Sequence, residues 1–241
     1  MKKKILLKAP LLTRSGYGEQ SRFALRALRS REDLFEIFIH PLQWGQTSWM
    51  AMVDVERAWI DQTIEKTIAY VQQGGQFDIS IQVTIPNEWE GLAPVNVGYT
   101  AGIETTKVAH QWIQKGNEMD KIIVVSNHSK NVFKDTVYFA SPQENPTQQI
   151  ELRLSTEIDA VDYPTKSFEN LPDLNISFDY DINFLTVAQF GPRKNIPSTV
   201  KWFVEEFRDE EVGLILKTNL AKNCLMDREK VTLDLTMFLR E

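Results

Sequence analysis

Strand-like and helix-like segments alternate along the first 135 residues, and this alternation limits the fold more than any other feature of the chain. Short runs rich in Ile, Val and Phe have the composition of buried strands, and they lie at 3–9, 35–40, 77–83, 94–101 and 121–126. Apolar residues recur at helical spacing at 18–30, 55–73 and 105–118, and in a short helix that Asn127 would cap. This order predicts βαβ units, so we expect an α/β fold with a mostly parallel sheet and helices on both faces.

The pattern changes beyond residue 140. Prolines and turn formers are frequent from there to residue 182, and the stretches SPQENPTQ and YPTKSFENLPDLN predict a crossing segment or linker. A second alternation then follows, with a strand at 182–190, a helix at 197–208, a strand at 212–218 and a helical pattern from about Asp227. The chain therefore holds the beginning of a second α/β region.

These changes predict the domain organisation. We expect a first domain at 1–165, a linker at 166–182 and the start of a second domain at 183–241. Two parallel strands bury little core, and the last helical pattern carries no C-cap signal. The second domain is thus expected to be incomplete, and the chain to be the N-terminal part of a longer protein.

Composition excludes several classes of protein. Hydrophobic residues make up 42% of the chain and charged residues 25%, as in ordinary soluble proteins. The single cysteine, Cys224, rules out an intramolecular disulfide and a cysteine zinc cluster and fits a reducing compartment. No apolar run approaches the roughly 18 residues of a membrane span, and the start MKKKILLKAP lacks a signal-peptide core, so we expect a cytoplasmic protein. The net charge of −6 disfavours a nucleic-acid binder.

Positive charge is concentrated at the N-terminus. Residues 1–31 contain a single acid, Glu19, against the cations Lys2, Lys3, Lys4, Lys8, Arg14, Arg22, Arg26, Arg29 and Arg31. Such a cluster indicates either a local contact with an anionic partner or a solvated helix face. The first alternative leaves open a weak peripheral contact with the inner face of a membrane.

Two glycines follow the first strand in the stretch TRSGYGEQSR (13–22). A dinucleotide fingerprint would need a third glycine where Ser21 or Phe23 stands, and no GK[ST] follows, so NAD-binding and P-loop sites are disfavoured. We expect a loop that ends at Gly18, where a helix starts with its N–H groups facing outward. Such a helix start can hold an anion or a sugar hydroxyl, although the same residues also fit a plain loop.

The second region opens with the loop GPRKN (191–195), which follows its first strand. Open α/β sheets bind ligands at the carboxyl ends of their strands. Arg193 offers a bidentate fork and Lys194 a point charge, and both suit phosphate oxygens. The alternative is an ordinary polar βα loop.

Other polar residues fall at comparable places in the first region. Glu104 lies at a strand-to-helix junction, and Ser126 and Asn127 follow the strand KIIVVS, so all three are candidates to line a cleft. The histidines His40, His110 and His128 match no metal-ligand spacing, and no GxSxG elbow occurs.

Taken in order, these segments resemble a known family. The glycine turn, the stretch ETTKVAHQWIQKGNEMDKIIVVSNHSKNVF and the stretch FLTVAQFGPRKNIPSTVKWFVEEF followed by VGLILKT are similar to the retaining, nucleotide-sugar-dependent glycosyltransferases of the GT-B fold, of the group 1 or family-four type. The resemblance is sharpest over 102–133 and 183–218. It implies two Rossmann-like domains that face each other across a cleft, with the acceptor on the first domain and the sugar nucleotide on the second.

The resemblance also implies roles for individual residues. Gly16 and Gly18, with Tyr17 between them, match the loop that approaches the donor diphosphate and the transferred sugar. Lys194 matches the basic residue on the donor phosphates. The family's arginine is replaced here by the pair Ala188-Gln189, and Arg193 is its candidate substitute.

Two family features have no counterpart in the chain. No Glu-x7-Glu donor motif follows Lys194, which fits an incomplete second domain. Gln82 stands where the family often has a histidine at the end of a strand, so Gln82 is a candidate cleft-lining residue and no catalytic base is assigned.

The expected function follows from the resemblance. It is the transfer of a sugar, with retention, from a nucleotide-sugar donor to a glycan or lipid-linked acceptor, without a metal or other cofactor. The 241-residue chain alone is expected to show little turnover. A different class stays open, namely a non-catalytic α/β ligand-binding or interaction module, whereas an NAD-dependent oxidoreductase is disfavoured by the missing fingerprint.

Overall fold

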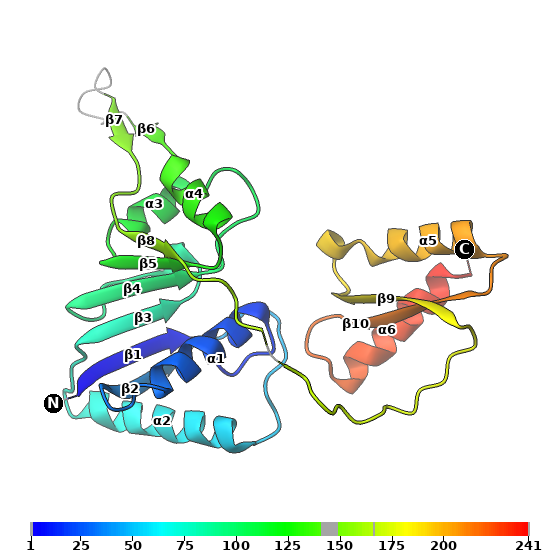
Figure 1. Cartoon of the computed structure of the whole chain (residues 1–241), viewed down its shortest axis with the longest axis horizontal. Helices are drawn as coiled ribbons and strands as arrows, with labels where there is room; N and C mark the ends of the chain where they lie inside the picture. The colour runs from blue at the N-terminus through cyan, green and yellow to red at the C-terminus, as the bar shows by residue number, and fades with distance from the viewer. Residues whose placement is uncertain (1, 141–148, 166, 241) are drawn as a thin grey trace. The chain divides into compact units, whose positions relative to one another are not determined.

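The computed structural model describes residues 2–140, 149–165 and 167–240, and the chain divides into two compact units. One unit comprises 1–45 and 50–165, and the other comprises 46–49 and 166–241. The first unit is built on a six-stranded sheet in the order β2-β1-β3-β4-β5-β8, in which every pair is parallel (Figure 1). Its strands are β1 (Lys3–Ala9), β2 (Phe35–Pro41), β3 (Ile79–Val83), β4 (Val95–Thr100), β5 (Lys121–Val124) and β8 (Ile158–Ala160). The expected α/β, Rossmann-like architecture is thereby confirmed.

Helix α1 (Gly16–Arg29) packs on one face of this sheet. Its Leu25 and Leu28 are buried in a cluster with the strand residues Ile5 and Ile37. Apolar residues recur every three or four positions in α1, and residues at this spacing share one face of a helix, so that face is the one that is buried.

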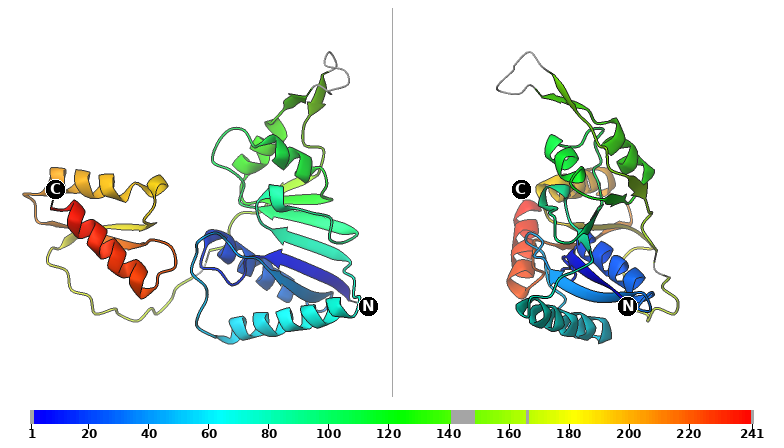
Figure 2. Two further views of the ribbon diagram at one scale, coloured as in Figure 1. Left: turned by 180° about the vertical axis from the view of Figure 1, so that it is seen from behind. Right: turned by 90° about the vertical axis from the view of Figure 1, so that its left-hand side faces the viewer.

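Helix α2 (Val55–Gln72) runs along the β2 edge of the sheet, as Figure 2 shows from behind. The hydroxyl of Thr67 accepts a hydrogen bond of 2.8 Å from the backbone N–H of Ile39 on β2. An unpaired strand edge is a template for aggregation. Here α2 covers the edge and satisfies one of its outward donors.

The other face of the sheet is covered by α3 (His110–Gly116), α4 (Asn127–Asp135) and a loop that contains the 3₁₀ turn η1 (Pro86–Glu88). Successive residues of β5 point to opposite faces, so Ile123 joins the α1 cluster while Ile122 joins a second cluster. That second cluster contains Trp89, Ile113 and Phe133. No α-helix connects β3 to β4, and the buried Trp89 of this connection packs in the second cluster instead.

Several boundaries differ from the sequence-based expectations. Helix α1 begins at Gly16, because Ser15 caps it, and not at Gly18. The helix expected at 105–118 is only the seven residues of α3, because the chain after β4 forms an irregular loop that includes Gly102 at a φ of +81°. The N-cap of α4 is Ser126 and not Asn127, since the Ser126 hydroxyl accepts from Ser129 N–H.

The segment from about 140 to 182 was expected to be a crossing segment or linker. Its stretch SPQENPTQ (141–148) lies outside the described residues, and among the described residues the expectation is wrong for part of the segment. It supplies β8, the sixth strand of the sheet, and β7 (Ile150–Leu152), which forms an antiparallel pair with β6 (Tyr138–Ala140). These strands have only three residues each, so no periodic pattern marks them.

The second unit contains one parallel strand pair, β9 (Ile182–Gln189) with β10 (Val212–Asn219), and the helices α5 (Ile196–Phe207) and α6 (Leu225–Phe238). Phe184 of β9 contacts Phe203 and Phe207 of α5, with ring centroids 5.9 and 5.4 Å apart. The unit's large exposed apolar side chains include Leu185, Val187, Trp202, Leu225, Met226 and Leu239.

Candidate functional site

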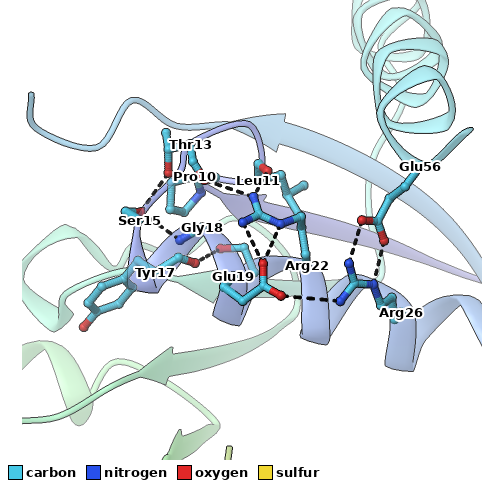
Figure 3. Close-up of polar contacts among 11 residues, drawn as sticks. Pro10, Leu11, Thr13, Ser15, Tyr17, Gly18, Glu19, Arg22, Arg26 and Glu56 are labelled. Carbon is cyan, nitrogen blue, oxygen red and sulfur yellow. Dashed lines mark hydrogen bonds and ion pairs between the residues drawn. The ribbon is translucent and has the colours of Figure 1, made fainter. Parts of the chain in front are cut away.

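The start of α1 lies just beyond the carboxyl end of β1, where parallel sheets bind ligands. Ser15 is the N-cap, and its Oγ accepts from Gly18 N–H at 2.9 Å while it bonds to Thr13 Oγ1 at 2.8 Å (Figure 3). Ser15 is favoured here because the first N–H groups of a helix have no carbonyl partner within it. The first-turn N–H groups of Gly16 and Tyr17 belong to this positive end of the helix.

The two glycines of the stretch occupy different surroundings. A Cβ atom on Gly18 would lie 2.1 Å from the carbonyl oxygen of Thr13, so this position has no room for a side chain. A Cβ atom on Gly16 would meet nothing within 4 Å. Gly18 is therefore required by packing inside the first unit, whereas Gly16 borders open space in which a ligand can approach the helix.

Tyr17 joins three segments at this edge. Its ring stacks on that of Trp44, which follows β2, with centroids 4.2 Å apart. Its hydroxyl bonds to Thr100 Oγ1 at 2.8 Å and accepts from Ala101 N–H at 3.2 Å, both at the end of β4. Burial of the ring raises the pKa of the Tyr17 phenol above its ordinary value.

Trp44 is a site residue that sequence reasoning missed. Its position in a polar loop gives no periodic signal, and only the fold brings it against Tyr17. The Ala101 carbonyl in turn accepts from Ser129 Oγ on α4, at 3.3 Å. The ends of β2, β4 and β5 are thus tied together at the edge from which α1 starts.

Four arginines of the basic N-terminal stretch, Arg22, Arg26, Arg29 and Arg31, have partners inside the first unit. Arg22 is buried and donates to the carbonyls of Leu11 and Thr13 at 2.7 and 3.0 Å (Figure 3). Arg26 forms a bidentate pair with Glu56, both bonds being 2.7 Å. These side chains connect α1 to the preceding loop and to α2, so the charge cluster has a structural use.

Lys8, His40 and Gln82 lie in register on three adjacent parallel strands. Residues in register point to the same face of a sheet, so the three side chains form a polar row near its carboxyl edge. The Lys8 ammonium is buried and donates to the carbonyl of Glu88 at 3.1 Å and to the Glu90 carboxylate. The bond from Lys8 holds the pKa of the Glu90 carboxyl below its usual range.

His40 lies beside this pair. Burial and the neighbouring Lys8 ammonium lower the pKa of the His40 imidazole, and the Glu90 carboxylate acts in the opposite direction. The imidazole is therefore biased toward its neutral form.

Gln82, a candidate cleft residue, is fully buried, and its amide bonds to the backbone of Glu90 with both of its polar atoms. Gly98 continues the row on β4, and a Cβ atom there would lie 2.6 Å from the ring of Trp89. In this structure Gln82 and Gly98 hold the β3–β4 loop against the sheet.

The remaining candidates of the first unit lie farther along the same edge. Ser126 caps α4, and Asn127 is the exposed first residue of that helix. Glu104 is exposed in the loop after β4. The structure therefore gathers Gly16, Tyr17 and Ser126 at the carboxyl edge, while Glu104 and Asn127 face solvent.

In the second unit, Arg193 and Lys194 belong to the 3₁₀ turn η2 (Pro192–Lys194) at the carboxyl end of β9. Asn195 follows at a φ of +49° and leads directly into α5. Both cations are exposed, and neither has an ion-pair partner among the residues that the structure describes. The turn thus presents two free cations next to a helix start.

Comparison of the chain with family models, curated proteins and solved structures finds no match. Within 2–140, 149–165 and 167–240, no group of three or more His, Cys, Asp or Glu side chains is placed to hold a metal ion. In those same ranges, no helix has the length and apolarity needed to cross a bilayer.

Proposed function

We propose that the chain is part of a nucleotide-sugar-dependent glycosyltransferase, with the sugar nucleotide bound at the η2 turn and the acceptor on the first unit. The observation that carries the proposal is the pair of unpartnered cations, Arg193 and Lys194, between the carboxyl end of β9 and the start of α5. The parallel sheet of the first unit and its sequence order of elements agree with the family resemblance.

The chemistry suits this arrangement. Glycosyl transfer develops negative charge on the departing nucleoside diphosphate and positive charge on the sugar. A guanidinium fork, an ammonium and helix N–H groups stabilise the diphosphate, so catalysis depends mainly on positioning and electrostatics. We expect a glycan or lipid-linked saccharide as acceptor and a cytoplasmic location, as proposals that rest on the same resemblance.

Calorimetric titration of the 241-residue chain with UDP- and GDP-sugars tests the proposal. We expect saturable binding that the double variant Arg193→Ala/Lys194→Ala weakens by about tenfold or more, since the loss of even one charge-assisted bond to phosphate costs roughly 1.5 kcal/mol. The matched control is Lys201→Ala/Arg208→Ala, which removes two exposed cations, one in α5 and one at its C-cap, that already face Glu205 and Asp209. Equal affinities in the wild type and the Arg193/Lys194 variant would remove the basis for the proposal.

A non-catalytic interaction module remains the second candidate, and the exposed apolar side chains of the second unit favour it. Trp202 is 62% exposed and Met226 is 78% exposed, and large exposed apolar side chains are the groups that a partner protein would cover. This candidate predicts that no sugar nucleotide binds to either variant or to the wild type.

A further inference from the structure

An apolar groove lies beside α1 on the face of the sheet that α1 covers. Helix α1 lines it with Phe23, Ala24 and Ala27, and the strands line it with Ile81, Tyr99 and Ile123. Its cavity volume is about 360 Å³. The groove exists because α1 packs over the β1 side of the sheet, while none of the other helices that the structure describes covers β4 and β5 on this face.

The size of the groove limits its occupant. Pockets for small ligands have volumes of about 300–1,000 Å³ and mostly apolar walls. The groove is therefore large enough for a slender apolar group such as an aliphatic chain.

Charge at the rim limits the occupant further. The segment after β8 closes the groove with Val161, Asp162 and Pro164, and Asp162 supplies the one carboxylate among the described lining residues. These described lining residues include no lysine, arginine or histidine. A carboxylate repels anionic head groups such as phosphates and fatty acids, but it accepts hydrogen bonds from neutral hydroxyl groups.

We propose that this groove binds the aliphatic tail of a neutral amphiphile whose hydroxyl-bearing head group bonds to Asp162. An alkyl glycoside has this chemistry. This inference extends the proposed function, because it names a neutral glycolipid as the acceptor class, and only this assignment rests on that function. The groove itself belongs to the first unit alone.

The probe is octyl glucoside below its critical micelle concentration. Glucose, which has the head group alone, and octanol, which has the tail alone, are titrated separately. We expect saturable binding of octyl glucoside and octanol by calorimetry or by NMR shifts, and none of glucose. Ala27 is exposed, and Ala27→Phe fills the groove, so it should weaken both ligands by about tenfold, the loss expected when two methylene groups stay unburied. Ala69→Phe, on the exposed side of α2, is the matched control and should bind like the wild type.

Asp162→Ala separates the head group from the tail. It should weaken octyl glucoside about three- to tenfold and leave octanol unchanged, because only the glycoside hydroxyls bond to the carboxylate. Lack of saturable binding to the wild type, or undiminished binding to an Ala27→Phe protein that melts like the wild type, overturns the inference. Binding of octyl glucoside without any sugar-nucleotide binding would keep the groove and contradict the transferase proposal.

Discussion

At the scale of single residues, the two glycines at the start of α1 differ in whether their surroundings leave room for a side chain. Gly18→Ala should lower the free energy of unfolding by about 1–3 kcal/mol, because the new methyl group overlaps the Thr13 carbonyl. Gly16→Ala should leave it unchanged or raise it by up to about 1 kcal/mol, because alanine favours the helix and meets no atom. Urea denaturation measures both values. Equal losses in the two variants would contradict the packing at Thr13.

A second residue-scale prediction concerns Tyr163, whose hydroxyl donates to Gln20 on α1 at 3.1 Å. Burial raises the pKa of Tyr163 to about 12, above the value of about 10 for an unfolded tyrosine. The folded state therefore favours the neutral phenol, and this contribution to stability is complete below about pH 10 and lost as the pH rises toward 12.

Alkaline unfolding, followed by near-UV circular dichroism, measures the effect. The variant Tyr163→Phe should lose less stability than the wild type over this pH range. Tyr180→Phe is the control and should follow the wild type, because Tyr180 is exposed to a similar extent (43% against 45% for Tyr163) but belongs to the second unit. A Tyr163→Phe profile that coincides with the wild type would contradict the prediction.

Residue roles were only partly predictable from the sequence. The glycine pair and the Tyr17 between them could be singled out because glycines mark turns and loops that are recognisable from the sequence alone. The contacts of Tyr17 with Trp44 and Thr100 could not, since those residues are 27 and 83 positions away and meet only in the folded sheet. Likewise, nothing in the spacing of Arg22 indicates that its guanidinium is buried against two carbonyls.

At the scale of elements, α2 satisfies a backbone donor at the β2 edge of the sheet through the side chain of Thr67. Thr67→Val should destabilise the protein by about 1–3 kcal/mol, because it removes the acceptor of Ile39 N–H and leaves a buried donor without a partner. Thr63→Val, one turn earlier, is the matched control. Its hydroxyl donates to the Trp59 carbonyl of the same helix, which already accepts within the helix, so this change should cost less than Thr67→Val.

Thermal or urea melts of the two variants decide the matter. The prediction fails if both substitutions cost the same. If Thr67→Val loses more stability, the amide hydrogen of Ile39 should also exchange faster with solvent. A general packing defect would instead speed up exchange at many positions.

Elements were predictable where they are long. The strands β1 to β5 and the helix α2 appear at nearly the expected residues, because each contains enough turns or alternations to show its period. Strand β8 was missed since its three residues, Ile158–Ala160, are recognisable only by their pairing with β5. The short α3 was overextended because helical spacing alone cannot show where Gly102 and the irregular loop after it interrupt the chain.

At the scale of the whole molecule, the chain should separate into its two units under limited proteolysis. Residues 167–181 contain no helix or strand, and every side chain there is exposed, including Phe168, Leu174 and Phe178. Chymotrypsin should therefore cut within this segment first and leave an N-terminal fragment that still unfolds cooperatively. Mass spectrometry of the early products, and a thermal melt of the purified fragment, test this. Initial cuts inside the six-stranded sheet would contradict it.

The β3–β4 loop that covers the sheet with Trp89 has an optical consequence. Trp89 is 1% exposed and lies in an apolar cluster, whereas Trp49 and Trp202 are 45% and 62% exposed. Its indole should emit at shorter wavelength than theirs and resist quenching by iodide. A red shift of the Trp89 emission would therefore report when the β3–β4 loop separates from the sheet. It would also show whether this separation precedes the unfolding of the rest of the first unit or coincides with it.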